Sequence, residues 1–368
     1  MMYKIGPLIF NLSGEGKLLN SIEEEFHSIR LSNNNYKPEL TFNFLDTLEL
    51  VEYNSTIDEL YVGENVFKAT LFGLTYQVFF ENGLPFKINI LNPDYSQNNF
   101  KRTIRRILNW NYLYQWEKHA TIFIYGVFDY ITCLHLLKSG SCYLHASAIV
   151  NDANEGICMV AWGGVGKSSS MLKYVMEHNY KYLSDDLVVL DKEGLLWRSP
   201  KKMQIYAYNL KNFLKLQKQL FIKRNILDKL SWNLHLKLRG PKKVRRRVKA
   251  EELFAKELIA EKAILKKTLF LQRSCSSDFS LRELTTTELA EKAANILRKE
   301  LQPLFDYNVA LSVIDHQVFL NSKDFINMAI KNISQGVKNS IIIQINIPEK
   351  ATPKELISYL NKNILANE

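Results

Sequence analysis

Cysteine is scarce in this sequence, and the cysteines lack the spacing that would give them a common role. The 368 residues include four cysteines, and no two of them form the C-x-x-C pair that is typical of metal and redox sites. Cys133, Cys142 and Cys158 lie in apolar runs. We therefore expect reduced core cysteines in a cytoplasmic protein rather than a disulfide framework.

Targeting and membrane signals are also missing. The initial stretch MMYKIGPLIFNLSGEG has a short apolar patch but no signal-peptide architecture. No run approaches the ~18 apolar residues that cross a bilayer, so we expect no membrane contact. With 46% hydrophobic and 12% aromatic residues, the chain has enough apolar side chains for packed cores. Its length favours two or three domains.

Acidic residues are almost absent from residues 211–249. This segment has fourteen Lys and Arg and one acid, Asp228, so it carries +13, whereas the whole chain carries +10. Such a local excess favours an anionic partner, either an acidic peptide or a nucleic acid. Few aromatic residues interleave with the charges, which makes nucleic acid the weaker candidate. The alternative is the solvated charged face of a helical insertion.

The stretch AWGGVGKSSS, residues 161–170, nearly matches the phosphate-binding loop G-x-x-x-x-G-K-[ST]. Gly166, Lys167 and Ser168 match the pattern, while Ala161 replaces its first glycine. The two glycines between them can supply the positive φ angles of the turn. The apolar run ICMVAW precedes the loop and an amphipathic helical pattern follows it. A glycine turn with a coincidental lysine is the alternative.

Two adjacent carboxylates, Asp185 and Asp186, lie between the apolar runs YKYL and LVVL. A phosphate loop that moves a phosphoryl group needs a metal ligand and a group that accepts a proton. If Ser168 is the first Mg²⁺ ligand, the two acids can divide these tasks, since successive strand residues alternate faces. A solvated SDD turn is the alternative.

His145 is the only histidine in the apolar strand pattern CYLHASAIV. A lone histidine in such a strand is most often a core residue with one hydrogen bond. This strand precedes the one that leads into the phosphate loop, so a second interpretation is open. In that interpretation His145 orients one of the carboxylates or shifts its pKa.

Taken together, LHASAIV, AWGGVGKSSS and YKYLSDDLVVL resemble the histidine strand, P-loop and Asp-Asp strand of the HPr kinase/phosphorylase superfamily. That superfamily shares its core with phosphoenolpyruvate carboxykinase. The resemblance implies that ATP phosphates are bound by residues of the loop and the following helix start, namely Gly163, Gly164, Val165, Gly166, Lys167, Ser168 and Ser169.

The resemblance also implies a role for each polar residue. Lys167 would neutralise the β- and γ-phosphates, and Ser168 together with Asp185 would hold Mg²⁺. Asp186 would deprotonate a serine-type hydroxyl, and His145 would hold the acid pair. The bifunctional enzymes carry a Glu-Arg-Gly signature after the acid pair, which LWRSPKKMQIYAYNL does not contain. The phosphorylase reaction and the protein HPr as acceptor are therefore not implied.

Hydrophobic periodicity predicts the organisation of the chain. Residues 1–140 are expected to form a β-rich N-terminal domain with a helical end. That helical end is indicated by four apolar residues at helical spacing, Ile104, Ile107, Leu108 and Leu113. Residues 141–300 would form a P-loop kinase core with a basic helical insertion at 210–262, and residues 301–368 a C-terminal α/β segment. The predicted fold class is α/β, or α+β, with a core like that of HPr kinase and phosphoenolpyruvate carboxykinase.

We therefore predict an ATP-dependent kinase that uses Mg²⁺ and phosphorylates a hydroxyl group, a serine of a peptide or protein. One alternative is a nucleic-acid-associated ATP-binding protein that uses residues 211–249. Another is a module that binds nucleotide without catalysis. Arg273 follows an expected core strand and is a candidate for contacting the γ-phosphate, with a structural ion pair equally open.

Overall fold

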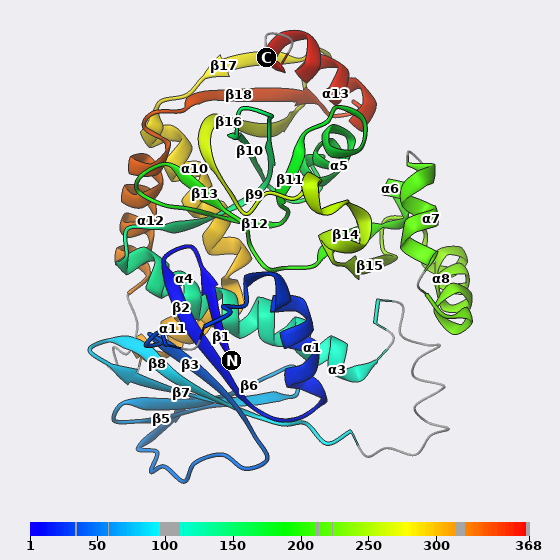
Figure 1. Ribbon diagram of the computed structural model, residues 1–368. Coiled ribbons are helices and arrows are strands. Elements are labelled where there is room, and N and C mark those ends of the chain that lie inside the picture. Colours follow the sequence, from blue (N-terminus) through cyan, green and yellow to red (C-terminus); the bar gives the residue numbers. More distant parts are fainter. Residues whose placement is uncertain are drawn as a thin grey trace.

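The protein is a mixed α/β molecule with two large sheets (Figure 1). The computed structural model describes residues 1–33, 35–57, 59–95, 111–112, 114–210, 213–222, 224–313 and 321–365. Ile104, Ile107, Leu108 and Leu113, on which the helix prediction before residue 114 rests, lie outside the described residues.

The first sheet has eight strands and contains most of the N-terminal part of the chain, as its β-rich pattern predicts. Its strands are β1 (Met2–Ile5), β2 (Leu8–Gly14), β3 (Leu40–Leu45), β4 (Ser55–Ile57), β5 (Leu60–Gly63), β6 (Val66–Leu71), β7 (Leu74–Glu81) and β8 (Leu84–Leu91). They lie in the order β1-β2-β3-β8-β7-β6-β5-β4. Helix α1 (Lys17–Phe26) connects β2 to the next strands. Apolar and polar residues alternate along β3, which buries one face of the sheet.

The second sheet carries the predicted core motifs. Its strands are β9 (Cys142–Val150), β10 (Glu155–Ala161), β11 (Lys181–Ser184), β12 (Leu187–Leu190), β13 (Leu195–Trp197), β16 (Lys262–Ser274), β17 (Ser280–Glu283) and β18 (Ile341–Pro348). β10, β16 and β18 are parallel neighbours, so their carboxyl ends meet at one edge. β9 runs antiparallel to β10 and pairs on its other side with both β11 and β12. This places the acid pair beside β9, one strand away from β10, which leads into the predicted phosphate loop.

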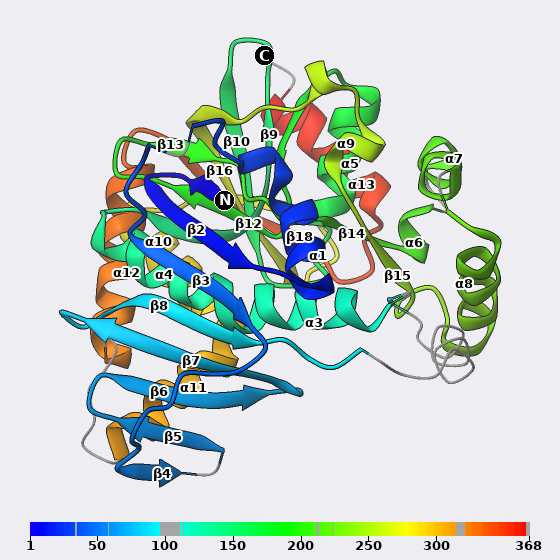
Figure 2. The same ribbon diagram turned by 60° about the horizontal axis from the view of Figure 1, so that its bottom comes forward.

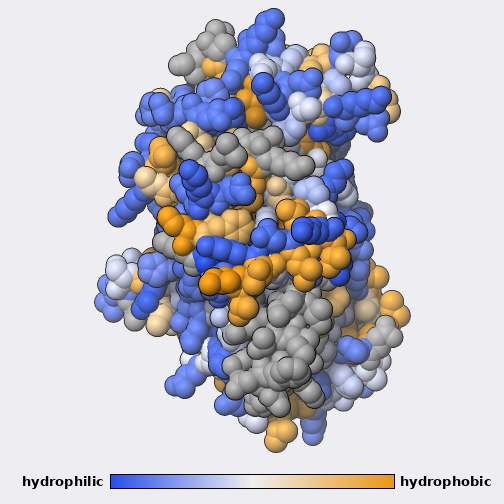
Figure 3. All heavy atoms as spheres, turned by 90° about the vertical axis from the view of Figure 1, so that its right-hand side faces the viewer, coloured by the Kyte–Doolittle hydropathy of each residue, from blue (hydrophilic) through white to orange (hydrophobic). Residues whose placement is uncertain are grey.

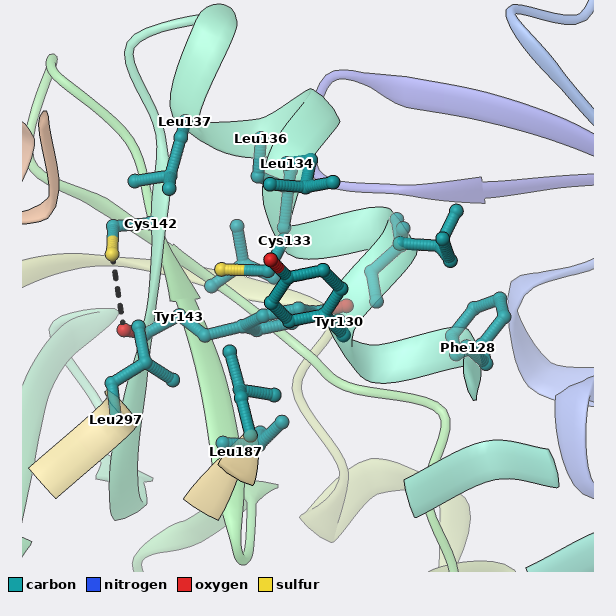
Figure 4. Close-up of a cluster of buried hydrophobic side chains, with 14 of the residues drawn as sticks. Phe128, Tyr130, Cys133, Leu134, Leu136, Leu137, Cys142, Tyr143, Leu187 and Leu297 are labelled. Carbon is teal, nitrogen blue, oxygen red and sulfur yellow. Dashed lines mark hydrogen bonds between the residues drawn. The ribbon is translucent and has the colours of Figure 1, made fainter. Parts of the chain in front are cut away.

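Helix α4 (Asp129–Lys138) lies between the two sheets and contacts β2 and β8 of one and β9 of the other (Figures 1 and 2). Figure 4 shows its side chains packed against β9, Leu187 of β12 and Leu297 of α10 (Thr286–Glu300). Cys133 and Cys142 are buried and free in this core, as predicted. One hydrophobic core therefore continues from the N-terminal sheet into the second sheet.

The helices before β9 form one nearly continuous rod. α3 (Gln115–Phe123) passes through a π-helical turn (Ile124–Phe128) into α4. The stretch Gln115–Lys138 is long and apolar enough to cross a membrane, but 89% of its most apolar window is buried inside the protein. This burial is typical of a core helix. On the outside of the molecule lie α12 (Ser322–Val337), which packs on α10, and α13 (Pro353–Leu360), which packs on α5 (Lys167–Glu177). Helix α11 (Gln302–Val313) follows α10 and contacts both α12 and the π-helical turn.

The prediction of a wholly helical basic insertion is wrong. Its first part contains α6 (Ala207–Leu210), α7 (Leu214–Ile222) and α8 (Ile226–Arg239), but the run RRRV is strand β15 (Arg245–Val248). β15 pairs with β14 (Met203–Tyr206), and the short helix α9 (Ala250–Leu253) follows it. The arginines are used inside the protein: Arg246 is buried against Asp228, and Arg247 pairs with the buried Glu25.

The outer face of α8 carries apolar side chains beside charged ones. Several of its side chains are exposed, among them Ile226 at 74%, Leu230 at 60% and Leu238 at 70%. Figure 3 faces the α7–α8 side and shows apolar side chains on this surface. The opposite face, with Trp232 and His235, is buried against the remainder of the insertion.

We predict that the insertion depends on the buried carboxylate of Asp228. Its Oδ1 accepts a hydrogen bond from Nε of Arg246 at 2.8 Å, and both side chains are almost completely buried. Asp228→Asn leaves the guanidinium without its counterion and should lower the free energy of unfolding by about 3 kcal/mol, measured by urea unfolding.

Two comparison variants test whether the loss of stability in Asp228→Asn comes from the unpaired guanidinium. Asn225→Ala removes only the N-cap of α8 and should cost about 1 kcal/mol. Asp228→Leu combined with Arg246→Met removes both charges and should be more stable than Asp228→Asn. Equal stability of Asp228→Asn and the wild type would contradict the assignment.

Candidate functional site

The phosphate loop connects the end of β10 to the start of α5. Gly164 and Gly166 have φ angles of 79° and 120°, which favour glycine. Ala161, in place of the first glycine of the pattern, is the last residue of β10 and is buried in the sheet. Alanine is compatible with a strand, so the turn itself keeps the glycines that it requires. The first backbone N–H groups of α5 face the loop, as an anion site needs.

Lys167 lies at the first position of α5 and is buried. Its Nζ donates to the carbonyl oxygens of Ala161 at 2.7 Å and Trp162 at 3.2 Å. Nζ also lies 3.3 Å from Nε2 of His145. Burial lowers the pKa of the ammonium, and the nearby carboxylates of Asp185 and Asp186 oppose this effect. The lysine therefore joins the loop to the predicted histidine and both predicted acids.

Asp185 is buried between two hydroxyl groups. Its Oδ1 accepts hydrogen bonds from Oγ of Ser147 on β9 at 2.5 Å and from Oγ of Ser168 at 2.8 Å. Burial raises the pKa of this carboxyl, and the two hydroxyls oppose the rise. The structure thus brings the two expected Mg²⁺ ligands, Ser168 and Asp185, into direct contact.

The backbone bends at Asp186, and this bend separates its side chain from that of Asp185. Its φ angle is 75°, in the left-handed region that aspartate enters more readily than most residues. Asp185 and Asp186 therefore do not lie on alternating faces of one strand, as predicted, but in a bend between β11 and β12. The backbone oxygen of Asp186 accepts a hydrogen bond from the N–H of Ala146 at 3.1 Å, which fixes the bend against β9.

The carboxylate of Asp186 is held by a lysine that the sequence analysis missed. Nζ of Lys201 lies 3.2 Å from Oδ2 of Asp186 and 2.6 Å from Oδ2 of Asp129 on α4. It also lies 4.0 Å above the ring of Tyr125. Burial would raise the pKa of Asp186, but the charges of Lys201 and His145 outweigh it and lower the pKa to about 2. Asp186 is therefore ionised at neutral pH.

His145 connects the acids to a second residue that was missed, Glu300 at the end of α10. Nδ1 of His145 lies 3.1 Å from Oε1 of Glu300, and Nε2 lies 3.7 Å from Oδ1 of Asp186. Nε2 also lies 3.3 Å from Nζ of Lys167, so one ring nitrogen faces Glu300 and the other faces Lys167 and Asp186. The nearby His145 lowers the pKa of Glu300.

The new residues complete a chain of charges that runs Glu300, His145, Asp186, Lys201 and Asp129. Burial raises the pKa of Asp129 to about 6, against the attraction of Lys201. The residues that were missed lie far along the sequence from the motifs, in a helix end, a loop and a core helix. No local pattern marks them, and the only hint was the pair of lysines in RSPKKMQ.

Three other predicted positions have structural contacts. Oγ of Ser169 accepts a hydrogen bond from Nδ2 of Asn209, which ties α5 to α6, and Val165 is buried. Nη1 of Arg273 donates to the carbonyl oxygens of Pro348 and Ala351, at 2.7 and 2.8 Å. Arg273 thus fixes the turn before α13.

The donor set suits a hard cation that keeps other ligands. Ser168 and Asp185 offer oxygen, and Mg²⁺ is commonly bound by one or two protein oxygens together with phosphate oxygens and water. Among the residues that the structure describes, no group of three or more His, Cys, Asp and Glu could hold a metal ion alone. These two residues fit Mg²⁺ that arrives with a nucleotide better than they fit a resident metal.

No family model matches the chain, and no curated protein matches it. Among solved structures, the chain is similar to the Hpr(Ser) kinase/phosphatase from Coxiella burnetii, with 11% sequence identity and a TM-score of 0.27. The similarity covers 61% of this chain and 97% of that protein. A likeness at this score supports no conclusion about activity.

We predict that the ionised Asp186 stabilises the fold in a defined pH range. Its pKa is about 2 in the folded protein, against 3.8 as the ordinary value, so the unfolded chain binds more protons between these pH values. The stabilisation is therefore complete above about pH 4 and is lost as the pH falls through about 2. It amounts to about 2 kcal/mol.

The test compares urea unfolding of the wild type and Asp186→Asn as a function of pH. Asparagine tolerates the left-handed conformation, so the backbone is preserved. The difference in stability should shrink as the pH falls below about 4. A difference that is independent of pH would show that the charge of Asp186 is not stabilised by its neighbours.

Proposed function

We propose that the protein transfers the γ-phosphoryl group of ATP to a hydroxyl group, that of a serine in a peptide or protein. The observation that carries this proposal is the convergence of Lys167, Asp185 and Asp186 at one place. The hydroxyl of Ser168 lies 2.8 Å from Asp185, and His145 lies between Lys167 and Asp186. If the glycine turn matched the phosphate-loop pattern only by coincidence, there would be no reason for these three side chains to lie close together.

The loop and α5 bind the triphosphate. Backbone N–H groups from Gly163 to Ser169 and the positive end of the helix dipole face the phosphates. Lys167 exchanges its contacts with loop carbonyls for contacts with phosphate oxygens. Ser168 and Asp185 would hold Mg²⁺, which would supply positive charge to neutralise the phosphates.

Asp186 receives the proton of the acceptor. The hydroxyl oxygen forms a bond to the γ-phosphorus, the bond between that phosphorus and the β–γ bridging oxygen breaks, and ADP leaves. The acceptor proton passes to the carboxylate and then to solvent. Because the transition state is loose, the hydroxyl loses its proton late and a strong base is not needed. Lys201 keeps Asp186 in the ionised form, and His145 and Glu300 hold its position.

The same geometry weighs against a module that only binds nucleotide. Binding needs the loop, Lys167 and a metal ligand, but it gives no reason to keep Asp186 in a left-handed conformation beside a buried lysine. For the nucleic-acid alternative, the arginines of β15 contribute little, since Arg246 and Arg247 already pair with acids inside the protein. That alternative would depend on the exposed lysines of residues 211–249.

The proposal predicts that Asp186→Asn separates binding from transfer. With γ-labelled ATP, Mg²⁺ and serine peptides, kcat should fall at least about 100-fold because the proton has no acceptor. The affinity for ATP, measured by calorimetry, should stay within about twofold because the loop is unchanged.

Asp152→Asn is the matched control, since this aspartate lies on an exposed turn outside the site. It should leave both quantities unchanged. An Asp186→Asn protein that transfers phosphate at a rate near that of the wild type would overturn the assignment of Asp186. A wild type that binds ATP but phosphorylates no hydroxyl would overturn the proposed function itself.

A second prediction concerns the pH dependence of transfer. Lys201 is the main positive charge that lowers the pKa of Asp186, and burial acts in the opposite direction. Lys201→Met should therefore raise this pKa and move the acid limb of kcat/KM to higher pH, whereas Lys201→Arg keeps the charge and should move it little.

Lys201→Met also leaves Asp129 buried without a cation, which destabilises the fold. The double variant Asp129→Asn with Lys201→Met removes that penalty and should show the same shift of the acid limb. An acid limb that does not move in either variant would show that Lys201 does not control the protonation of Asp186.

A further inference from the structure

A pocket of about 270 Å³ lies beside the proposed catalytic residues. Its walls come from parts of the chain that are far apart in sequence. Leu71 and Phe72 belong to the β6–β7 hairpin, Ile122 and Tyr125 to α3 and its π-helical turn, Arg245 to β15 and Glu300 to α10. The N-terminal sheet therefore contributes to this pocket together with the core.

Two of its walls touch the neighbours of Asp186 directly. Glu300 lies 3.1 Å from His145, which is 3.7 Å from Asp186. Nζ of Lys201 lies over the ring of Tyr125 and is 3.2 Å from Oδ2 of Asp186. The pocket is thus separated from the proposed base by one layer of side chains. Since consecutive Cα atoms are about 3.8 Å apart, a residue next to the acceptor can reach the pocket while the hydroxyl meets Asp186.

The lining of the pocket is mostly apolar. Leu71, Phe72 and Ile122 supply hydrocarbon surface. Gly126 lets Leu71 pack closely against the π-helical turn, because a Cβ atom at this position would lie 2.3 Å from Cδ2 of Leu71. The charge of Arg245 is partly satisfied, since its Nη1 donates to the hydroxyl of Tyr206 at 2.7 Å. The carboxylate of Glu300 would repel an acidic ligand.

Phe72 is the unusual residue of this pocket. Its side chain is 74% exposed, and its φ angle of 48°, with 83° at Gly73, is that of the two-residue turn of the β6–β7 hairpin. A large aromatic side chain exposed to water at a hairpin tip contributes nothing to the core. Burial of this ring against a ligand would give it a role.

We propose that the pocket binds an apolar side chain, aliphatic or aromatic, of the residue adjacent to the acceptor serine in the peptide substrate. This inference rests on the proposed function, because it identifies the pocket by its distance from the proposed base. It restricts the substrate class to peptides in which the serine has an apolar neighbour. The basic segment 211–249 plays no part in it apart from Arg245.

The test uses three tripeptides, acetyl-Leu-Ser-Leu-amide, acetyl-Gly-Ser-Gly-amide and acetyl-Asp-Ser-Asp-amide, with ATP and Mg²⁺. The wild type should phosphorylate the leucine peptide with a kcat/KM at least about tenfold above that of the glycine peptide, and the aspartate peptide least well. Phe72→Ala should reduce the preference for leucine over glycine to about twofold. Phe86→Ala, at another exposed phenylalanine, is the matched control and should keep the preference.

The outcomes separate the pocket from the proposed function. Transfer to all three peptides at equal kcat/KM, or a preference that Phe72→Ala leaves intact, overturns the pocket and leaves the kinase standing. If no peptide is phosphorylated, the proposed function fails, and direct binding of the leucine peptide is measured by calorimetry. Binding that Phe72→Ala weakens and Phe86→Ala does not supports the pocket as a ligand site. Absence of binding overturns it.

Discussion

The ion pair between Lys201 and Asp186 is the interaction on which the site depends. A carboxylate that is mostly removed from water is costly to keep ionised unless a cation lies beside it. Lys201 provides that cation 3.2 Å away and is itself held by Asp129 at 2.6 Å. Asp186 lies in the bend between β11 and β12 of the second sheet, and Asp129 lies in α4. The charge balance of the site therefore involves both parts of the chain.

This constraint gives the N-terminal region a role beyond stability. Asp129 and Tyr125 hold Lys201 from the rod between the two sheets, and Leu71 and Phe72 form a wall of the adjacent pocket. The continuous hydrophobic core fixes these residues relative to β9 and the acid pair. A phosphate loop is a general device, whereas the surface that surrounds the base can distinguish one acceptor from another.

The sequence was sufficient for the local parts of the structure and insufficient for the distant ones. The loop, its flanking strand and helix, and the position of Asp185 and Asp186 after a short strand follow from residues that are close together. Lys201 and Glu300 reach the site only through the fold, and neither residue has a local pattern. The segment that contains RRRV was predicted to bind an anionic partner or to face solvent, but Asp228 and Glu25 neutralise Arg246 and Arg247 inside the protein.

The two acids have different partners, and under the proposed function this difference assigns them different roles. Asp185 is held by two hydroxyl groups, and burial raises its pKa, so a cation at this carboxylate would relieve an unfavourable environment. Asp186 already has Lys201, and a metal ion there would add a second positive charge beside the first. Mg²⁺ is therefore expected at Asp185 and Ser168. Under the proposed function, Asp186 would be left without a metal and would face the acceptor, which is the arrangement that proton removal requires.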